Sequence, residues 1–191
     1  QRAVILDAGH GGADGGAVSD SGVAESGLNL AITLRLADVL TFCGYEVLLT
    51  RTGEEALCDD PAATLRQQKV SDTKKRVEII NSCADAWLIS IHQNSYPEAE
   101  ISGPQVFYYG SSEMSKKLAE AIQAQLIVDL QPPKEREIKT GNDLYILKNS
   151  QCPGVIVECG FLSNPTECEN LQNPQYQQAV AAAIARAICK L

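Results

Sequence analysis

The chain contains only two histidines, and each of them follows an apolar segment of the sequence. His10 lies three residues past the apolar run 3–7, in a glycine-rich segment, and His92 ends the apolar run 86–92. A third apolar run, GVIVECG, carries Glu158 near its end. Two imidazoles and one carboxylate form the ligand set of a catalytic zinc site with an open position for water. A further carboxylate can then serve as general base.

Six segments of the sequence are predicted to be strands, and helical patterns separate most of them. The strands are expected at residues 3–7, 45–50, 86–92, 104–109, 144–147 and 155–158. The helices are expected at residues 25–43, 72–81, 112–130 and 174–190, with a short helix after the turn at Pro165. This alternation predicts one α/β domain over residues 1–191, with a mostly parallel, twisted sheet of about six strands flanked by helices.

Local signals add detail to these elements. The spacing of four residues in the first helix predicts that they share one face: Leu30, Leu34, Ala37 and Thr41. Asp72 and Ser112 are expected to be the N-caps of the second and third helices. Residues 131–140 contain two prolines and several charges, and we expect them to form a linker.

The predicted strands bring the chemically interesting side chains to one place. Ligand sites in open α/β sheets form outside the carboxyl ends of the strands. Glu25 begins the helix that follows the His10 segment, so it belongs to the same edge of the sheet. We therefore expect four side chains to meet there: His10, Glu25, His92 and Glu158. Spacing alone does not decide whether Glu25, Asp7 or Asp14 is the third metal ligand.

Each of these residues also has a purely structural interpretation. A histidine near a strand end is usually structural, an acid at the end of an apolar run can mark the exit to solvent, and Glu25 can be a first-turn acid favoured by the helix dipole. The GHGGADGG segment resembles a phosphate-binding loop, but it matches neither G-x-x-x-x-G-K-[ST] nor G-x-G-x-x-G. Because both histidines end strands, we favour the metal site.

Composition narrows the classes of partner. The chain has 24 acidic and 16 basic residues, a net charge of −8 and a pI of about 4.8. Without a run rich in Lys and Arg, we expect neither nucleic-acid binding nor anchoring to anionic lipid. No apolar run approaches the roughly 18 residues of a membrane span. The first strand begins at Ala3, which leaves no room for a leader, so the start of the chain says nothing about export.

The seven cysteines are odd in number and show no C-x-x-C spacing. This pattern argues against a disulfide framework and against a thiolate zinc site, and we expect the cysteines to act as small apolar residues. On a strand, Cys159 would point to the face opposite Glu158. Arg51, at the end of the second strand, is expected to be a structural ion-pair partner.

Several segments together resemble the zinc-dependent N-acetylmuramoyl-L-alanine amidases of bacterial cell walls. They are ILDAGHGG at 5–12, Glu25 before a leucine-rich helix, VLLTR at 47–51, SIHQNS at 90–95 and VIVECGFLSNP at 155–165. The resemblance implies that His10, Glu25 and His92 hold one Zn²⁺ ion and that Glu158 is the catalytic acid and base. It implies hydrolysis of the amide bond between N-acetylmuramic acid and L-alanine in peptidoglycan.

Further segments are similar to the germination-specific, spore-cortex amidases: KKRVEIIN at 74–81 and GPQVFYYG at 103–110. This similarity implies a role in cortex maturation through muramic-lactam formation. The protein would act outside the cytoplasm, in the cell wall, the spore cortex or the space between the forespore membranes. An activating protein partner is compatible with the compact length.

Three points stay open on the sequence. Asn94 and Asn142 are candidate substrate contacts at the rim of the site, and each is equally well explained as a turn residue. The same ligand set would serve another zinc peptidoglycan hydrolase, such as a peptidase or a deacetylase. A non-catalytic wall-binding module on the same scaffold is the third interpretation, although it would be expected to lack Glu158 or a ligand.

Overall fold

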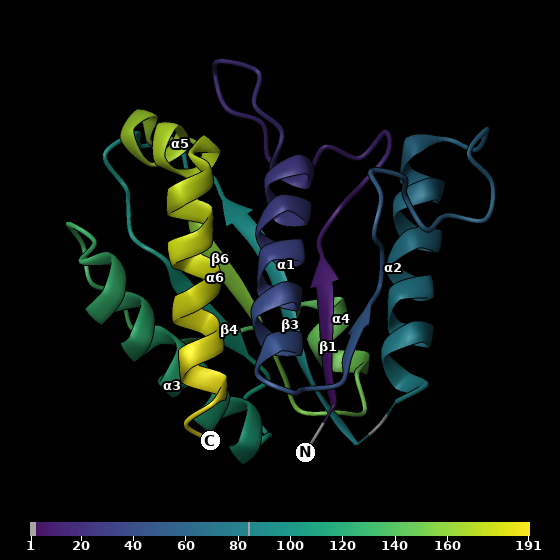
Figure 1. The fold of residues 1–191 in the computed structure, drawn as a ribbon. Coiled ribbons are helices and arrows are strands. Elements are labelled where there is room, and N and C mark those ends of the chain that lie inside the picture. Colours follow the sequence, from purple (N-terminus) through teal and green to yellow (C-terminus); the bar gives the residue numbers. More distant parts are fainter. Residues whose placement is uncertain (1–2, 84) are drawn as a thin grey trace.

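A six-stranded sheet runs through the centre of the computed structural model, which describes residues 3–83 and 85–191 (Figure 1). The strand order is β2-β1-β3-β6-β4-β5, with β1 Ala3–Ala8, β2 Val47–Leu49, β3 Ala86–Asn94, β4 Gln105–Tyr108, β5 Lys139–Thr140 and β6 Gly154–Phe161. The four strands β2, β1, β3 and β6 are parallel, whereas β4 is antiparallel to β6. The predicted mostly parallel α/β sheet is confirmed.

Helices cover both faces of the sheet (Figure 1). They are α1 Glu25–Phe42, α2 Leu65–Asn81, α3 Glu113–Leu130, α4 Tyr145–Asn149, α5 Pro165–Gln172 and α6 Pro174–Ile188. Side chains alternate along β1: Val4 and Leu6 pack in the larger core with α1, α3 and α6, and Ile5 packs in a second core with α2 and α4. The interior strands are therefore buried on both faces, which explains their continuous apolar sequences.

None of the helices in the described part of the chain combines the length and apolarity that crossing a bilayer requires.

The second predicted helix is longer than expected. It begins at Leu65, where Thr64 accepts a hydrogen bond from the backbone of Gln67 and the Gln67 side chain accepts one from the backbone of Thr64. With this capping box, Thr64 is the N-cap of α2, and the prediction of Asp72 as the N-cap was wrong. Asp72 lies inside the helix, where it is buried and forms an ion pair with Arg76.

Residues 145–147 belong to the short helix α4, and the prediction of a strand at 144–147 was wrong. Leu144 precedes the short helix α4, whose Ile146 and Leu147 pack into the core with α2. A run of apolar residues this short does not distinguish a strand from a buried helical turn. The sixth strand is instead β5, at the end of the predicted linker 131–140.

The buried face of α1 also differs from the prediction. Leu28, Ile32, Leu36 and Leu40 face the sheet. Of the four residues predicted to share a face, only Ala37 is buried, whereas Leu30 and Leu34 are partly exposed and Thr41 is exposed. Because α1 is apolar on more than one side, the leucine spacing alone does not identify its inner face. In α3 the predicted N-cap, Ser112, is confirmed, and Leu118, Ile122 and Leu126 form the buried face.

Candidate active site

The segment after β1 carries His10 in an unusual backbone conformation, with a φ of 62°. Two buried arginines hold its carbonyl groups in place. Arg76 donates through Nη2 to the carbonyl oxygen of His10 at 2.6 Å, and Arg51 donates through Nη2 to that of Gly9 at 3.1 Å. The left-handed conformation, costly for a residue with a side chain, is thereby fixed by the surroundings.

The role expected for Arg51 was an ion-pair partner, and the structure corrects it. Its guanidinium donates to four carbonyl oxygens, those of Ala8, Gly9, Ser26 and Gly53. Arg51 therefore joins the end of β1 to the start of α1, which are the two segments that carry His10 and Glu25.

Two glycines make room for the side chains that converge here. A Cβ atom on Gly9 would overlap the imidazole of His92. Gly16 has a φ of +69°, and a Cβ there would overlap the side chain of Glu25 and approach His10. The glycine-rich loop is thus required both for its backbone path and for the space it leaves.

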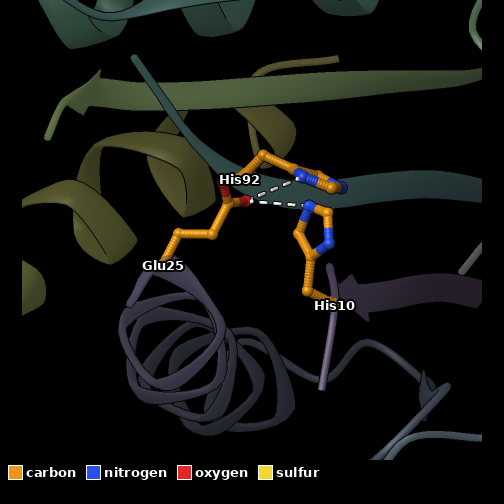
Figure 2. Close-up of side chains that lie close together, drawn as sticks. All are labelled: His10, Glu25 and His92. Atoms are coloured by element: carbon orange, nitrogen blue, oxygen red, sulfur yellow. Dashed lines mark hydrogen bonds and ion pairs between the residues drawn. The ribbon is translucent and has the colours of Figure 1, made fainter. Parts of the chain in front are cut away.

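His10, Glu25 and His92 lie together at the carboxyl edge of the sheet (Figure 2). Nε2 of His10 and Nδ1 of His92 are each 3.2 Å from Oε1 of Glu25. The centroids of the two imidazole rings are 5.0 Å apart. Neighbouring ligands of a tetrahedral ion with bonds of about 2.1 Å are separated by about 3.4 Å. The three side chains are therefore spaced to hold a metal ion.

The buried carboxylate of Glu25 is positioned by its own helix and by the loop. The backbone N–H of Ala17 donates to Oε2 at 2.7 Å, and the Asn29 amide donates to Oε1 at 3.0 Å. Burial raises the pKa of Glu25, but hydrogen bonds and charge from His10 and His92 outweigh it and hold the pKa well below its usual range. Sequence reasoning missed Asn29, although its position four residues after Glu25 on the helix was the available signal.

Asp14 and Asp7, the two other acids considered as ligands, have different roles. Asp14 Oδ2 lies 2.7 Å from Nδ1 of His10, and Lys69 Nζ is 2.8 Å from Oδ1 of Asp14. Asp14 thus contacts the side of the imidazole that faces away from Glu25. Asp7 is fully buried beneath the loop, where it pairs with Arg76 and accepts hydrogen bonds from Thr50 and Ser90.

The acids around His10 change its protonation. Burial lowers the pKa of the imidazole, but the hydrogen bonds and charges of Asp14 and Glu25 outweigh burial and raise the pKa to about 9. Without a metal ion, His10 is therefore protonated at neutral pH. A cation that replaces the proton on Nε2 would lie against Glu25, while the proton on Nδ1 would stay with Asp14.

Glu158 lies beside the cluster, because it is the partner of His92 in the parallel pairing of β3 and β6. The strand continues to Phe161, so Glu158 is inside β6 and not at its end. Its Oε2 is buried and has no hydrogen-bond partner among the described residues. Burial, reinforced by the charge of Glu25, raises the pKa of this carboxyl to about 7. Cys159, on the opposite face, is fully buried in the core as predicted.

The family model described as N-acetylmuramoyl-L-alanine amidase, Amidase_3, matches residues 4–190. This chain belongs to that amidase family. The germination-specific N-acetylmuramoyl-L-alanine amidase of Bacillus subtilis (strain 168) is 36% identical over 189 residues, which are 99% of this chain and 79% of the relative. The activity is therefore hydrolysis of the amide bond between N-acetylmuramic acid and L-alanine in peptidoglycan. This assignment replaces the three other functions considered from the sequence: a peptidase, a deacetylase and a non-catalytic wall-binding module.

Solved structures agree with this assignment. The CwlD amidase from Clostridioides difficile, solved in complex with the GerS lipoprotein, has a TM-score of 0.95 and 38% identity, and the match covers 100% of this chain and 98% of that chain. The catalytic domain of CwlV from Bacillus (Paenibacillus) polymyxa var. colistinus has a TM-score of 0.85 and 29% identity, with 100% and 97% covered.

A cleft of the amidase opens next to the histidines, between α2 and α4. His10, His92, Lys69, Leu144 and Tyr145 are among the residues that line it. Leu144 and Tyr145 were missed as site residues because 144–147 was expected to be a strand. The helical turn of α4 packs against α2 and places this segment in the lining of the cleft.

The two asparagines proposed as substrate contacts lie in different places. Asn94 is at the end of β3, two residues past His92, and its Oδ1 accepts a hydrogen bond from the backbone of Ser95. Asn142 follows β5, and its Oδ1 accepts a hydrogen bond from the backbone of Gly110. Asn142 lies beyond the end of β4 at which Tyr108 pairs with Val155. Glu158 pairs with Gln105 at the other end of β4, so Asn142 and Glu158 lie at opposite ends of this strand.

Proposed function

We propose that this amidase binds a single zinc ion through His10, Glu25 and His92 and uses Glu158 as its catalytic acid and base. The observation that carries the proposal is the spacing of the three ligand atoms, with both histidine nitrogens 3.2 Å from one carboxylate oxygen. The donor set also supports it, since two imidazoles and a carboxylate suit zinc and leave a position open. When bound, zinc supplies Lewis-acid chemistry, which lowers the pKa of water and offsets negative charge on the carbonyl oxygen.

Glu158 is suited to carry a proton in both directions. Its Oε2 has no partner among the described residues and is available to accept the proton of the attacking water. In the metal-free protein, burial raises the pKa of this carboxyl to about 7, close to the operating pH that favours a general acid and base. The same Oε2 then donates the proton to the leaving amine of L-alanine.

Substitution of Glu158 by glutamine tests the proton-transfer role. Glu158→Gln keeps the size of the side chain and removes its basicity, so kcat should fall by about 10²–10⁴-fold. Bound zinc should stay at one ion per chain, because Glu158 is outside the ligand set. Glu120→Gln, at an exposed position of α3, is the matched control and should keep full activity.

Two results would count against the assignment. Unchanged kcat in Glu158→Gln would show that another group transfers the proton. The protein should lose activity when a chelator removes its metal. If it still cleaves peptidoglycan after chelation, with no dependence on added zinc, the reaction does not need a metal ion. Metal content by mass spectrometry and release of L-alanine-linked peptides are the two measurements.

We also propose that the stem peptide of peptidoglycan enters the cleft between α2 and α4. Lys69 and Tyr145 lie on its wall beside the histidines, which suits a peptide with carboxylate groups. Asn94 and Asn142 stay predictions as substrate contacts. If Asn94 contacts the substrate, Asn94→Ala should raise KM. The KM of Asn142→Ala, measured in the same way, shows whether Asn142 contacts the substrate as well.

The setting of the activity is proposed from the relatives. A germination-specific relative and the CwlD structure favour action outside the cytoplasm, in the spore cortex. A strain without this gene should then form cortex that lacks muramic lactam, as measured by mass spectrometry of its muropeptides. Because the CwlD structure contains a lipoprotein, we propose a protein partner here as well. Co-elution of the amidase with a lipoprotein from the same organism is the test.

A further inference from the structure

Two exposed cysteines lie at the end of the molecule that is opposite to the active site. Cys43 is the C-cap of α1 and Cys189 is the C-cap of α6. Both helices end on the same side of the sheet (Figure 1). The other five cysteines are buried or partly buried. The prediction that cysteines serve as small apolar residues therefore does not account for this pair.

Packing between the ends of α1 and α6 brings the two cysteines near one another. Leu36 and Leu40 of α1 share one apolar core with Ile184 and Ile188 of α6. Next to the pair, the hydroxyl of Tyr45 donates to the carbonyl oxygen of Ile188 at 3.4 Å. Burial and the neighbouring Cys43 thiol together raise the pKa of the Cys189 thiol. The segment just after Cys43 and the residue just before Cys189 are therefore in direct contact.

We propose that Cys43 and Cys189 are a modification site, which closes to an intramolecular disulfide on reaction with a small-molecule disulfide such as oxidised glutathione. The thiolate of one cysteine attacks the small disulfide, breaks its S–S bond and releases one small thiol. The second cysteine then attacks the mixed disulfide and releases the other small thiol. Two protein thiols are oxidised and one disulfide is reduced to two thiols, which take up the two protons.

The bond would join α1 to the C-terminal helix without disturbing the chemistry. Glu25 begins α1 and Cys43 caps its other end, so an 18-residue helix, about 27 Å long, separates the disulfide from the ligand cluster. The closed loop contains most of the chain, which is the case in which a disulfide constrains the unfolded state most strongly. We expect the oxidised amidase to be more stable and equally active.

The experiment is oxidation of the full chain with oxidised glutathione at about pH 8.5, the ordinary pKa of a cysteine thiol. The expected product is a monomer lighter by two hydrogen atoms, with tryptic peptides 36–51 and 187–190 joined by a disulfide. Its Tm should be at least about 5 °C higher than that of the reduced protein. Cys43→Ser and Cys189→Ser should lose the joined peptide, and Cys58→Ser should keep it.

Three outcomes would overturn the proposal. A stable glutathione adduct on either cysteine would show that the thiols do not reach one another. A disulfide-linked dimer would show that they react with a second copy instead. An unchanged or lower Tm of the oxidised monomer would show that the bond strains the native packing.

Discussion

Oδ2 of Asp14 lies 2.7 Å from Nδ1 of His10, while Nε2 of the same imidazole points to Glu25 at 3.2 Å. The ring is therefore held from both sides, and Asp14 determines which nitrogen is available to a metal ion. Lys69 in turn contacts the second oxygen of Asp14. Partners of this kind orient a metal ligand and increase its basicity.

Replacing Asp14 by asparagine should weaken metal binding. An amide keeps the size of the side chain but loses the negative charge behind the imidazole, so zinc affinity should fall by about 10–100-fold. Competition with a chromophoric chelator measures the affinity. Asp20→Asn, at an exposed position of the same loop, is the control and should bind zinc as tightly as the wild type. Equal affinities in all three proteins would remove Asp14 from the metal site.

Metal binding should release a proton at neutral pH. In the metal-free protein the pKa of His10 is about 9, so the imidazole is protonated at pH 7 and its proton must leave before Nε2 can bind a cation. Apparent affinity should then rise about tenfold per pH unit as the pH approaches about 9 and level off above it. Calorimetry in two buffers with different ionisation enthalpies measures about one proton released per metal ion. Release of no proton at pH 7 would contradict the raised pKa.

Filling the space beside Glu25 and His10 with a single methyl group should weaken metal binding. Gly16→Ala would place a Cβ against Glu25 and His10 in a left-handed backbone, so it should abolish or strongly weaken zinc binding. Gly22→Ala is a matched control, because Gly22 has a φ of +86° but no neighbouring atom within 4 Å of the added Cβ. The control should lose only about 1 kcal/mol of stability. Equal zinc affinity in the two variants would show that the space at Gly16 is not needed.

Arg76 should contribute strongly to stability. It pairs with both Asp7 and Asp72 in the interior and donates to the carbonyl oxygen of His10. Arg76→Ala would leave two buried carboxylates without their partner, and the free energy of unfolding should fall by about 3–5 kcal/mol.

Urea denaturation gives the free energy of unfolding for the Arg76 variant. Arg66→Ala, at an exposed position of the same helix, should change this free energy by less than about 0.5 kcal/mol. A loss below about 1 kcal/mol in Arg76→Ala would show that solvent or other side chains compensate for the missing guanidinium.

The local errors in the predicted fold share one physical origin. Residues 144–147 and the leucines of α1 are apolar in patterns that fit more than one conformation or face, and only contacts with the rest of the chain select between them. Ile146 lies in a helical turn because α4 packs against α2 in the smaller core. The inner face of α1 is set by the sheet, against which Leu28 and Leu36 pack.

The sequence alone predicted the parallel sheet and the carboxyl edge at which the site lies. It also predicted that His10 and His92 converge, because parallel strands end on a common edge. The tertiary structure decided which acid joins them. Asp7, Asp14 and Glu25 were equivalent by spacing, but the left-handed turn at His10 aims one nitrogen at Glu25 and the other at Asp14. Side-chain direction depends on the path of the loop, and that path is held by contacts with Arg51 and Arg76, distant in the sequence.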